Sequence, residues 1–228
     1  MRFPESIARP AFLLAAAAAF SAVFGCSAAD APSLKRLSKT DAVWLDEDRK
    51  ELVVGGTVVL DRGPLELFAC PKGTKEHEAV VAVDAKAQIV HAGLLALGLE
   101  PGRPVSFDPE YAPATGPVVK IRMRWKGKDG KVAETPAQDW IRDTRTGKPM
   151  AADWVFVGSS FWKDETTGEE FYQADGGDLV CISNFPTATL DLPIASSQSN
   201  EALLFEVMEG VVPPRDTAVE MILSKGIR

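Results

Sequence analysis

The sequence predicts an α+β domain built from a mainly antiparallel β-sheet, one principal buried helix and a C-terminal β-meander. Three observations lead to this fold class. Apolar and polar residues alternate along residues 117–125, as in a strand with one buried face. Residues 85–97 are apolar on nearly every side, as in a buried helix. From residue 153 onward, short apolar segments are separated by acidic turns that contain glycine.

Residues 1–25 have the features of an export signal, with Arg2 and Arg9 before a short, alanine-rich apolar run. Cys26 follows in a context close to the one that lipoprotein signal peptidase cuts, so we expect a lipid on Cys26. Two alternatives remain. Cleavage at the small residues 27–29 would release a secreted protein, or Cys26 is a chance thiol beside a plain signal peptide. We therefore expect an exported protein, held in the cell envelope if it is lipidated.

The segment after the leader, residues 26–40, is small, polar and basic, and we expect it to be a tether. Residues 41–228 are enough for a single domain with a substantial core. The formal charge of −7 becomes −8 without the leader, whose two arginines and one glutamate carry a net +1. Such an acidic chain lacks the basic surface that nucleic acid requires. The expected partners are a protein or small-molecule ligand, and the membrane through the lipid.

The domain is expected to begin with two hairpins. Residues 42–45 and 51–60 are rich in strand-forming side chains and are separated by a charged turn. Residues 65–69 and 79–83 are apolar and are joined by the loop CPKGTKEHE. If they pair as a hairpin, Cys70 and His77 stand at opposite ends of this connecting loop.

The principal helix is expected at residues 85–97. Asp84 precedes it as a good N-cap, Gly98 follows as a C-terminal stop, and Pro101 lies just beyond. Because few of its residues are polar, the helix should be buried against the sheet.

A clear strand follows this helix. Along residues 117–125, Val119, Ile121, Met123 and Trp125 should face the core, and the intervening basic residues should face water. The meander is expected to use strands near residues 154–157, 170–174 and 179–183.

A metal site is one reading of Cys70, His77 and His91, which include both histidines of the chain. A thiolate and two imidazoles suit Zn²⁺ or copper and leave a coordination position open for water or substrate. Their spacing matches no short chelating motif. The more frequent role of a histidine like His91, on an apolar helix, is a hydrogen bond within the core.

A thiol enzyme is a second reading, in which His77 activates Cys70 and Glu66 or Glu78 orients the imidazole. A disulfide with Cys181 would remove Cys70 from any such role, while two separate buried thiols would behave as small apolar groups. An iron–sulfur cluster is not expected, because it needs about four cysteine ligands and only Cys70 and Cys181 are available beside the lipidated Cys26.

A longer set of residues, spread over positions 51–223, resembles the YdjY-type domain of exported bacterial proteins. In the first half these are Leu65-Glu66, Cys70, Lys75-x-His77-Glu78, His91, Leu94-Leu95-Ala96-Leu97-Gly98 and Pro101-Gly102-x-Pro104-Val105. In the second half they are Trp140, Trp154-Val155-Phe156-x-Gly158-Ser159, Ala174-Asp175 and Ile182-Ser183-Asn184-Phe185. The resemblance implies no particular activity, but it draws attention to Cys70, His77, Glu78 and His91. Glu66, Lys75 and Glu78 make up a further candidate functional cluster.

Three functions are therefore weighed. The leading expectation is a non-catalytic envelope module that binds a partner or ligand. The first alternative is a zinc or copper protein using Cys70, His77 and His91, and the second is a thiol-dependent hydrolase or transferase.

Overall fold

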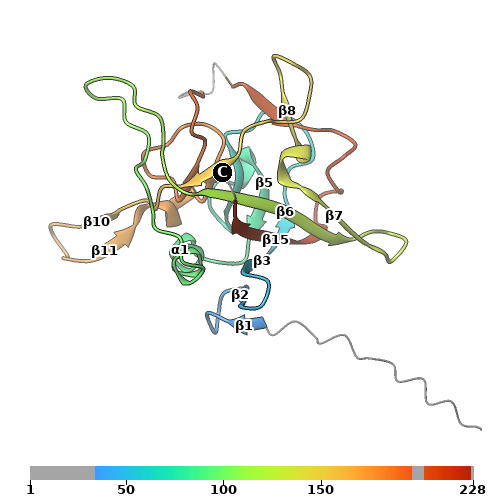
Figure 1. Cartoon of the computed structure of the whole chain (residues 1–228), viewed down its shortest axis with the longest axis horizontal. Coiled ribbons are helices and arrows are strands. Elements are labelled where there is room, and N and C mark those ends of the chain that lie inside the picture. Colours follow the sequence, from blue (N-terminus) through green and yellow to red (C-terminus); the bar gives the residue numbers. More distant parts are fainter. Residues whose placement is uncertain (1–33, 197–202, 227–228) are drawn as a thin grey trace, which may run out of the picture. The chain divides into compact units, whose positions relative to one another are not determined.

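The computed structural model describes residues 34–196 and 203–226, where the chain is mostly β and eight strands close into a barrel (Figure 1). The expected signal peptide, the lipidation site at Cys26 and the tether up to residue 33 lie outside the described residues. In order around the barrel, the strands are β3 (Glu51–Val58), β15 (Ala218–Lys225), β6 (Val118–Lys126), β9 (Trp154–Phe156), β13 (Leu190–Asp191), β12 (Val180–Cys181), β4 (Leu67–Pro71) and β5 (Ala79–Val83). β5 then pairs with β3 and closes the ring.

The remaining elements surround this barrel. They are β1 (Leu34–Arg36) and β2 (Val43–Asp46) beside β3, β7 (Val132–Pro136) beside β6, the pair β8 (Ile141–Asp143) and β14 (Phe205–Val207), the hairpin β10 (Phe161–Lys163) and β11 (Glu170–Tyr172), the helix α1 (Ala87–Ala96), and the 3₁₀ turns η1 (Glu76–Glu78), η2 (Ala137–Trp140) and η3 (Gln173–Gly176). None of the helices in the described part of the chain is long and apolar enough to cross a membrane.

The predicted α+β class, with its mainly antiparallel sheet and C-terminal meander, is therefore wrong. Two of the eight pairings in the ring, β4 with β5 and β12 with β13, are parallel. β9 pairs with β6 and β13, while β10 and β11 form a separate hairpin, so the expected meander is absent from the described residues. Alternation along one strand shows which side chains are buried, but it does not show whether the sheet closes on itself.

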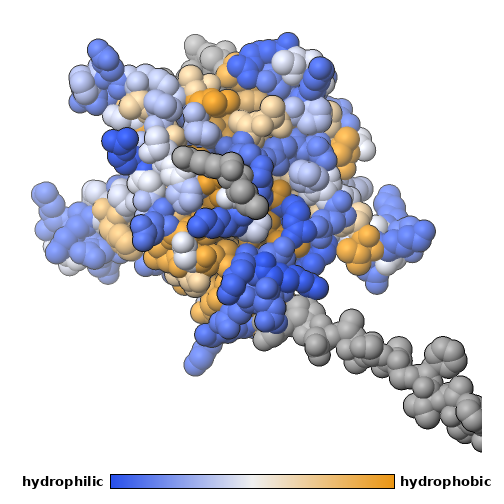
Figure 2. All heavy atoms as spheres, viewed as in Figure 1, coloured by the Kyte–Doolittle hydropathy of each residue, from blue (hydrophilic) through white to orange (hydrophobic). Residues whose placement is uncertain are grey.

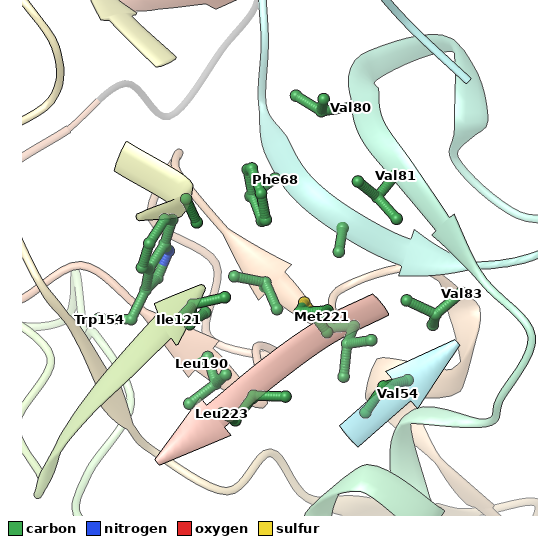
Figure 3. Close-up of a cluster of buried hydrophobic side chains, with 14 of the residues drawn as sticks. Val54, Phe68, Val80, Val81, Val83, Ile121, Trp154, Leu190, Met221 and Leu223 are labelled. Carbon is green, nitrogen blue, oxygen red and sulfur yellow. The ribbon is translucent and has the colours of Figure 1, made fainter. Parts of the chain in front are cut away.

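The barrel interior is filled by apolar side chains from several strands, which point toward one another in Figure 3. Val119, Ile121 and Met123 of β6 are buried in this core and Trp125 packs against it, as the alternation predicted. The predicted hairpin of β2 with β3 is also confirmed.

The helix α1 differs from its prediction in two respects. Its first turn is preceded by Lys86 rather than Asp84, and no side chain of its own segment caps it. Only one side of α1 is buried, because Leu95 on the opposite side is 46% exposed. Gly93 in the buried side lets Leu52 of β3 pack directly on the helix backbone, where a Cβ atom would lie 2.4 Å from a Leu52 methyl carbon.

A second apolar cluster lies outside the main core. It contains Leu67, Cys70, Ala79, Val105, Ala114, Val155, Val157, Cys181 and Ala188, with Phe107, Val118 and Phe185 packed against them. Residues of strands β4, β5, β9 and β12 are thus buried together with Val105 and Ala114 of the long segment between α1 and β6. This explains why β4 and β5 are apolar throughout instead of alternating.

Candidate functional site

The hairpin β10–β11 carries the largest exposed aromatic side chains of the described residues. Trp162 and Phe171 stand opposite each other in the ladder, and their rings are stacked with centroids 5.9 Å apart. Their side chains are 51% and 46% exposed, whereas apolar groups of this size are usually buried. In Figure 1 the hairpin extends away from the barrel, and Figure 2 shows a hydrophilic tip with hydrophobic groups nearer its base.

The hairpin turn has a defined geometry. The Asp164 carboxylate accepts hydrogen bonds from the backbone N–H groups of Thr166 and Thr167, at 2.7 and 3.0 Å. These bonds lower the pKa of Asp164 below its ordinary value. Gly168 adopts a φ of +75°, which a residue with a side chain tolerates poorly. The aromatic pair is therefore presented by an ordered hairpin.

A cleft of about 730 Å³ lies between this hairpin and the first turn of α1. Trp162, Phe171 and Tyr172 line it from the hairpin, Gln88 lines it from the helix, and Asp175 lines it from η3. A second groove of about 600 Å³ shares Lys86, Phe171 and Asp175 with the first and continues toward Asp41 and Asp84. The two openings form one bent surface around Phe171.

The first turn of α1 is held by carboxylates from distant parts of the chain. Asp41 accepts a hydrogen bond from the backbone N–H of Lys86 at 2.8 Å, and Asp175 accepts one from that of Gln88 at 3.0 Å. These groups would otherwise lack partners at a helix start, where negative charge is also favoured. Because Asp175 belongs to η3, its hydrogen bond joins η3 to the first turn of the helix at the cleft.

Tyr172 joins the hairpin to the helix beneath the cleft. Its hydroxyl donates to the carbonyl oxygen of Gly158 at 3.0 Å, and it lies 2.8 Å from Nδ1 of His91 and 3.1 Å from the hydroxyl of Thr189. A carbonyl can only accept, so the tyrosine proton is used there, and we assign the ring hydrogen of His91 to Nδ1. Burial lowers the pKa of His91 and raises that of Tyr172 to about 12.

The predicted cluster of Glu66, Lys75 and Glu78 does come together, and Asp178 completes it. Nζ of Lys75 lies 2.9 Å from Asp178 and 4.0 Å from Glu78, and it sits over the ring of Phe185. Burial lowers the pKa of Lys75, but the hydrogen bond and charge of Asp178 outweigh this effect and raise it. Burial, followed by the charge of Glu78, raises the pKa of Glu66.

This cluster supports the other wall of the cleft. Asp178 accepts a 2.5 Å hydrogen bond from the hydroxyl of Thr187, which lines the cleft. Lys75 therefore holds the loop around Gly177, whose φ of +143° brings the backbone against the Lys75 side chain. The charges lie mostly below the surface, so their role is to position the loop.

Cys70, His77 and His91 are not brought together. Cys70 is fully buried, the His77 side chain is 79% exposed, and His91 binds Tyr172. Among the described residues no group of three histidine, cysteine, aspartate or glutamate side chains could hold a metal ion. The expected hairpin would have placed Cys70 near His77, but β4 and β5 are parallel, and Cys70 pairs with Ala82 instead.

The two described cysteines are free thiols. Cys181 stands opposite Leu67 on β4, three residues from Cys70, which corresponds to about 10 Å along the strand and exceeds the Cα separation of a disulfide. Burial raises the pKa of Cys70 to about 11 and raises that of Cys181 well above its ordinary value. Neither sulfur has the exposed, thiolate-stabilising environment of a nucleophile.

The family model of the YdjY domain matches residues 43–224. The chain belongs to the YdjY domain family. The match spans the barrel, the helix and the hairpin of the YdjY domain, and it confirms the resemblance noted in the sequence. No curated protein and no solved structure matches the chain.

The sequence reasoning missed the aromatic hairpin of this YdjY domain. Phe171 fell in the strand expected near residues 170–174, whereas Phe161 and Trp162 lay in no expected strand. The available signal was the density of aromatic residues in two three-residue strands. Strands this short have little sheet to pack against, so Phe161, Trp162 and Phe171 remain at the surface, whereas Tyr172 is buried.

Proposed function

We propose that this YdjY domain is an exported, non-catalytic binding module of the cell envelope, whose ligand lies in the cleft beside hairpin β10–β11. The observation that carries the proposal is the stacked, half-exposed pair Trp162 and Phe171 on the wall of a 730 Å³ cleft. Ligand sites typically combine a concave surface, aromatic side chains and a few oriented polar groups.

Three polar groups of the cleft wall are engaged within the protein, which supports binding rather than catalysis by these groups. Asp175 is hydrogen-bonded to the helix, the Tyr172 hydroxyl is engaged with Gly158, and the Thr187 hydroxyl donates to Asp178. A general base or nucleophile must be free to reach the reacting group. These side chains instead maintain the shape of the cleft.

The two alternatives have less support. The thiol-dependent reading needs an accessible thiolate at Cys70, which is buried and has a raised pKa. The metal hypothesis needs Cys70, His77 and His91 to converge. Cys70 is buried, His77 is exposed and His91 is bonded to Tyr172, so the three form no common site.

The test compares the purified full-length protein with the double variant Trp162→Ala, Phe171→Ala on arrays of oligosaccharides and peptides. Both side chains are half-exposed, so the variant should keep its circular dichroism spectrum and a melting temperature close to that of the parent. We expect the parent to bind one class of probe and the variant to lose it. Identical binding patterns, or a parent that binds nothing on either array, would overturn the proposal. Val132→Ala, at an exposed position on β7, is the matched apolar control.

A further inference from the structure

The charge around the aromatic pair indicates which class of ligand the cleft takes. From Phe161 to Tyr172 the hairpin carries four carboxylates, those of Asp164, Glu165, Glu169 and Glu170, and one cation, Lys163. Glu165, Glu169 and Glu170 are exposed, and Trp162 lies between this acidic tip and the cleft. An anionic ligand or an anionic lipid surface would be repelled by this hairpin.

The two grooves continue the acidic surface around Phe171. Asp175 lines both of them, and Asp41 and Asp84 line the second. Of the two lysines in these linings, Lys72 lies 3.3 Å from Asp84, and the backbone of Lys86 is hydrogen-bonded to Asp41. Counted together, the two linings contain four carboxylates, those of Asp41, Asp84, Glu170 and Asp175, against these two lysines, so negative charge is in excess.

Exposed aromatic faces next to carboxylates are suited to cationic side chains. The face of an indole or phenyl ring attracts a guanidinium or ammonium group, and a neighbouring carboxylate adds a charge-assisted hydrogen bond. The protein itself uses this pairing nearby, where Nζ of Lys75 lies 4.8 Å from the centroid of the Phe185 ring. A neutral sugar would use the aromatic faces but not the surplus of carboxylates.

We propose that the occupant of the bent surface is an extended segment of a partner protein that is rich in arginine and lysine. Its aliphatic stems and cationic heads lie on Trp162 and Phe171, and its remaining charges face the carboxylates of the hairpin and of Asp175. Two connected grooves suit an extended segment better than a single side chain. This inference rests on the proposed function and specifies its ligand.

The experiment measures binding of fluorescent peptides to the full-length protein by anisotropy. The probes are a short peptide in which arginine and lysine alternate with serine, a peptide of equal length with glutamate in place of the basic residues, a neutral oligosaccharide, and vesicles containing anionic lipid. The test variant is Glu169→Lys, Glu170→Lys. The control, Glu110→Lys with Glu209→Lys, changes the net charge equally at exposed sites outside the hairpin.

We expect the basic peptide alone to bind, and its affinity should fall with added salt. The affinity should be about tenfold or more lower in the hairpin variant and almost unchanged in the control. Equal losses of affinity in both variants would overturn the proposal of a cationic ligand. Binding of the acidic peptide, the oligosaccharide or the vesicles instead of the basic peptide would overturn it too. If that other binding still depends on Trp162 and Phe171, the proposed cleft stands and only the ligand class is wrong. If a probe binds equally well to the Trp162→Ala, Phe171→Ala variant, both the proposed cleft and the proposed ligand class are wrong.

Discussion

Nδ1 of His91 on the helix lies 2.8 Å from the hydroxyl of Tyr172 at the base of the aromatic hairpin. This bond joins a residue of the family pattern to the wall of the cleft, although 81 positions separate the two in the chain. His91 thus acts through Tyr172 by positioning the hairpin.

Tyr172→Phe tests this link. The substitution removes one hydroxyl and leaves His91, the Gly158 carbonyl and Thr189 short of a partner, so the free energy of unfolding should fall by about 1–3 kcal/mol. Urea denaturation followed by fluorescence measures it. Tyr111→Phe is the matched control, because Tyr111 is 40% exposed and should change stability by less than about 0.5 kcal/mol. Equal effects in the two variants would show that the buried hydroxyl has no structural role.

Lys75→Met tests the buried ionic cluster. It removes the cation from between Asp178 and Glu78, and we expect a loss of about 2 kcal/mol, less than for a fully buried pair because Lys75 is about a third exposed. Lys72→Met removes an exposed pair with Asp84 and should have almost no effect. Chemical denaturation at neutral pH compares them, and a Lys75 variant as stable as the Lys72 variant would contradict the positioning role.

Asp191 should make stability depend on pH. Its side chain is buried, Oδ1 accepts from Asn184 and Leu192, and burial raises its pKa from 3.8 to about 7. Between these values the folded state holds a proton that the unfolded chain releases, so this contribution to stability is complete below about pH 4 and is lost as pH rises through about 7.

Asp191→Asn removes the ionisation while retaining the shape of the side chain. The stability of the variant relative to the parent should increase from pH 4 to pH 8, by on the order of 4 kcal/mol. Denaturation curves at several pH values give this difference directly. A constant difference across that range would mean that Asp191 ionises at its ordinary pKa.

The thiols of Cys70 and Cys181 should resist alkylation. Both are fully buried with raised pKa values, so iodoacetamide should modify neither in the native protein and both after unfolding in guanidinium. Peptide mapping by mass spectrometry separates their signals from that of Cys26. Rapid native labelling of Cys70 would restore the thiol-enzyme hypothesis.

Gly93→Ala tests the contact between helix and barrel. Alanine favours helices by about 1 kcal/mol over glycine, yet a methyl group here would overlap Leu52, so we expect a net loss of about 1–3 kcal/mol. In a Leu52→Ala background the same change should cost less or become favourable. A double-mutant cycle from denaturation curves measures this coupling, and additive effects would contradict the packing described.

Local patterns in the sequence predicted the local structure well. The two faces of β6 and the hairpin of β2 with β3 follow from alternation and turn composition, and both are confirmed. Glu66, Lys75 and Glu78 were singled out as candidates without a predicted arrangement, and the structure places them next to one another.

Pairings between distant segments could not be predicted. Cys70 and His77 are separated because β4 and β5 run parallel, and no residue in the intervening loop distinguishes a hairpin from this crossover. Phe171 was expected in a strand of the meander and Trp162 in no strand, but the two pair in a separate hairpin and are half-exposed. Burial depends on what covers a strand, and a single sequence does not contain that information directly.

The position of β15 in the ring has a consequence for the order of events during synthesis. This strand, at Ala218–Lys225, lies between β3 and β6, and it supplies the only link between them among the described strands. A nascent chain that lacks it has two open strand edges facing each other across a gap, and its interior cannot be sealed from water. The ring of strands can therefore close only after Ala218–Lys225 has been made, so the barrel is completed late in synthesis.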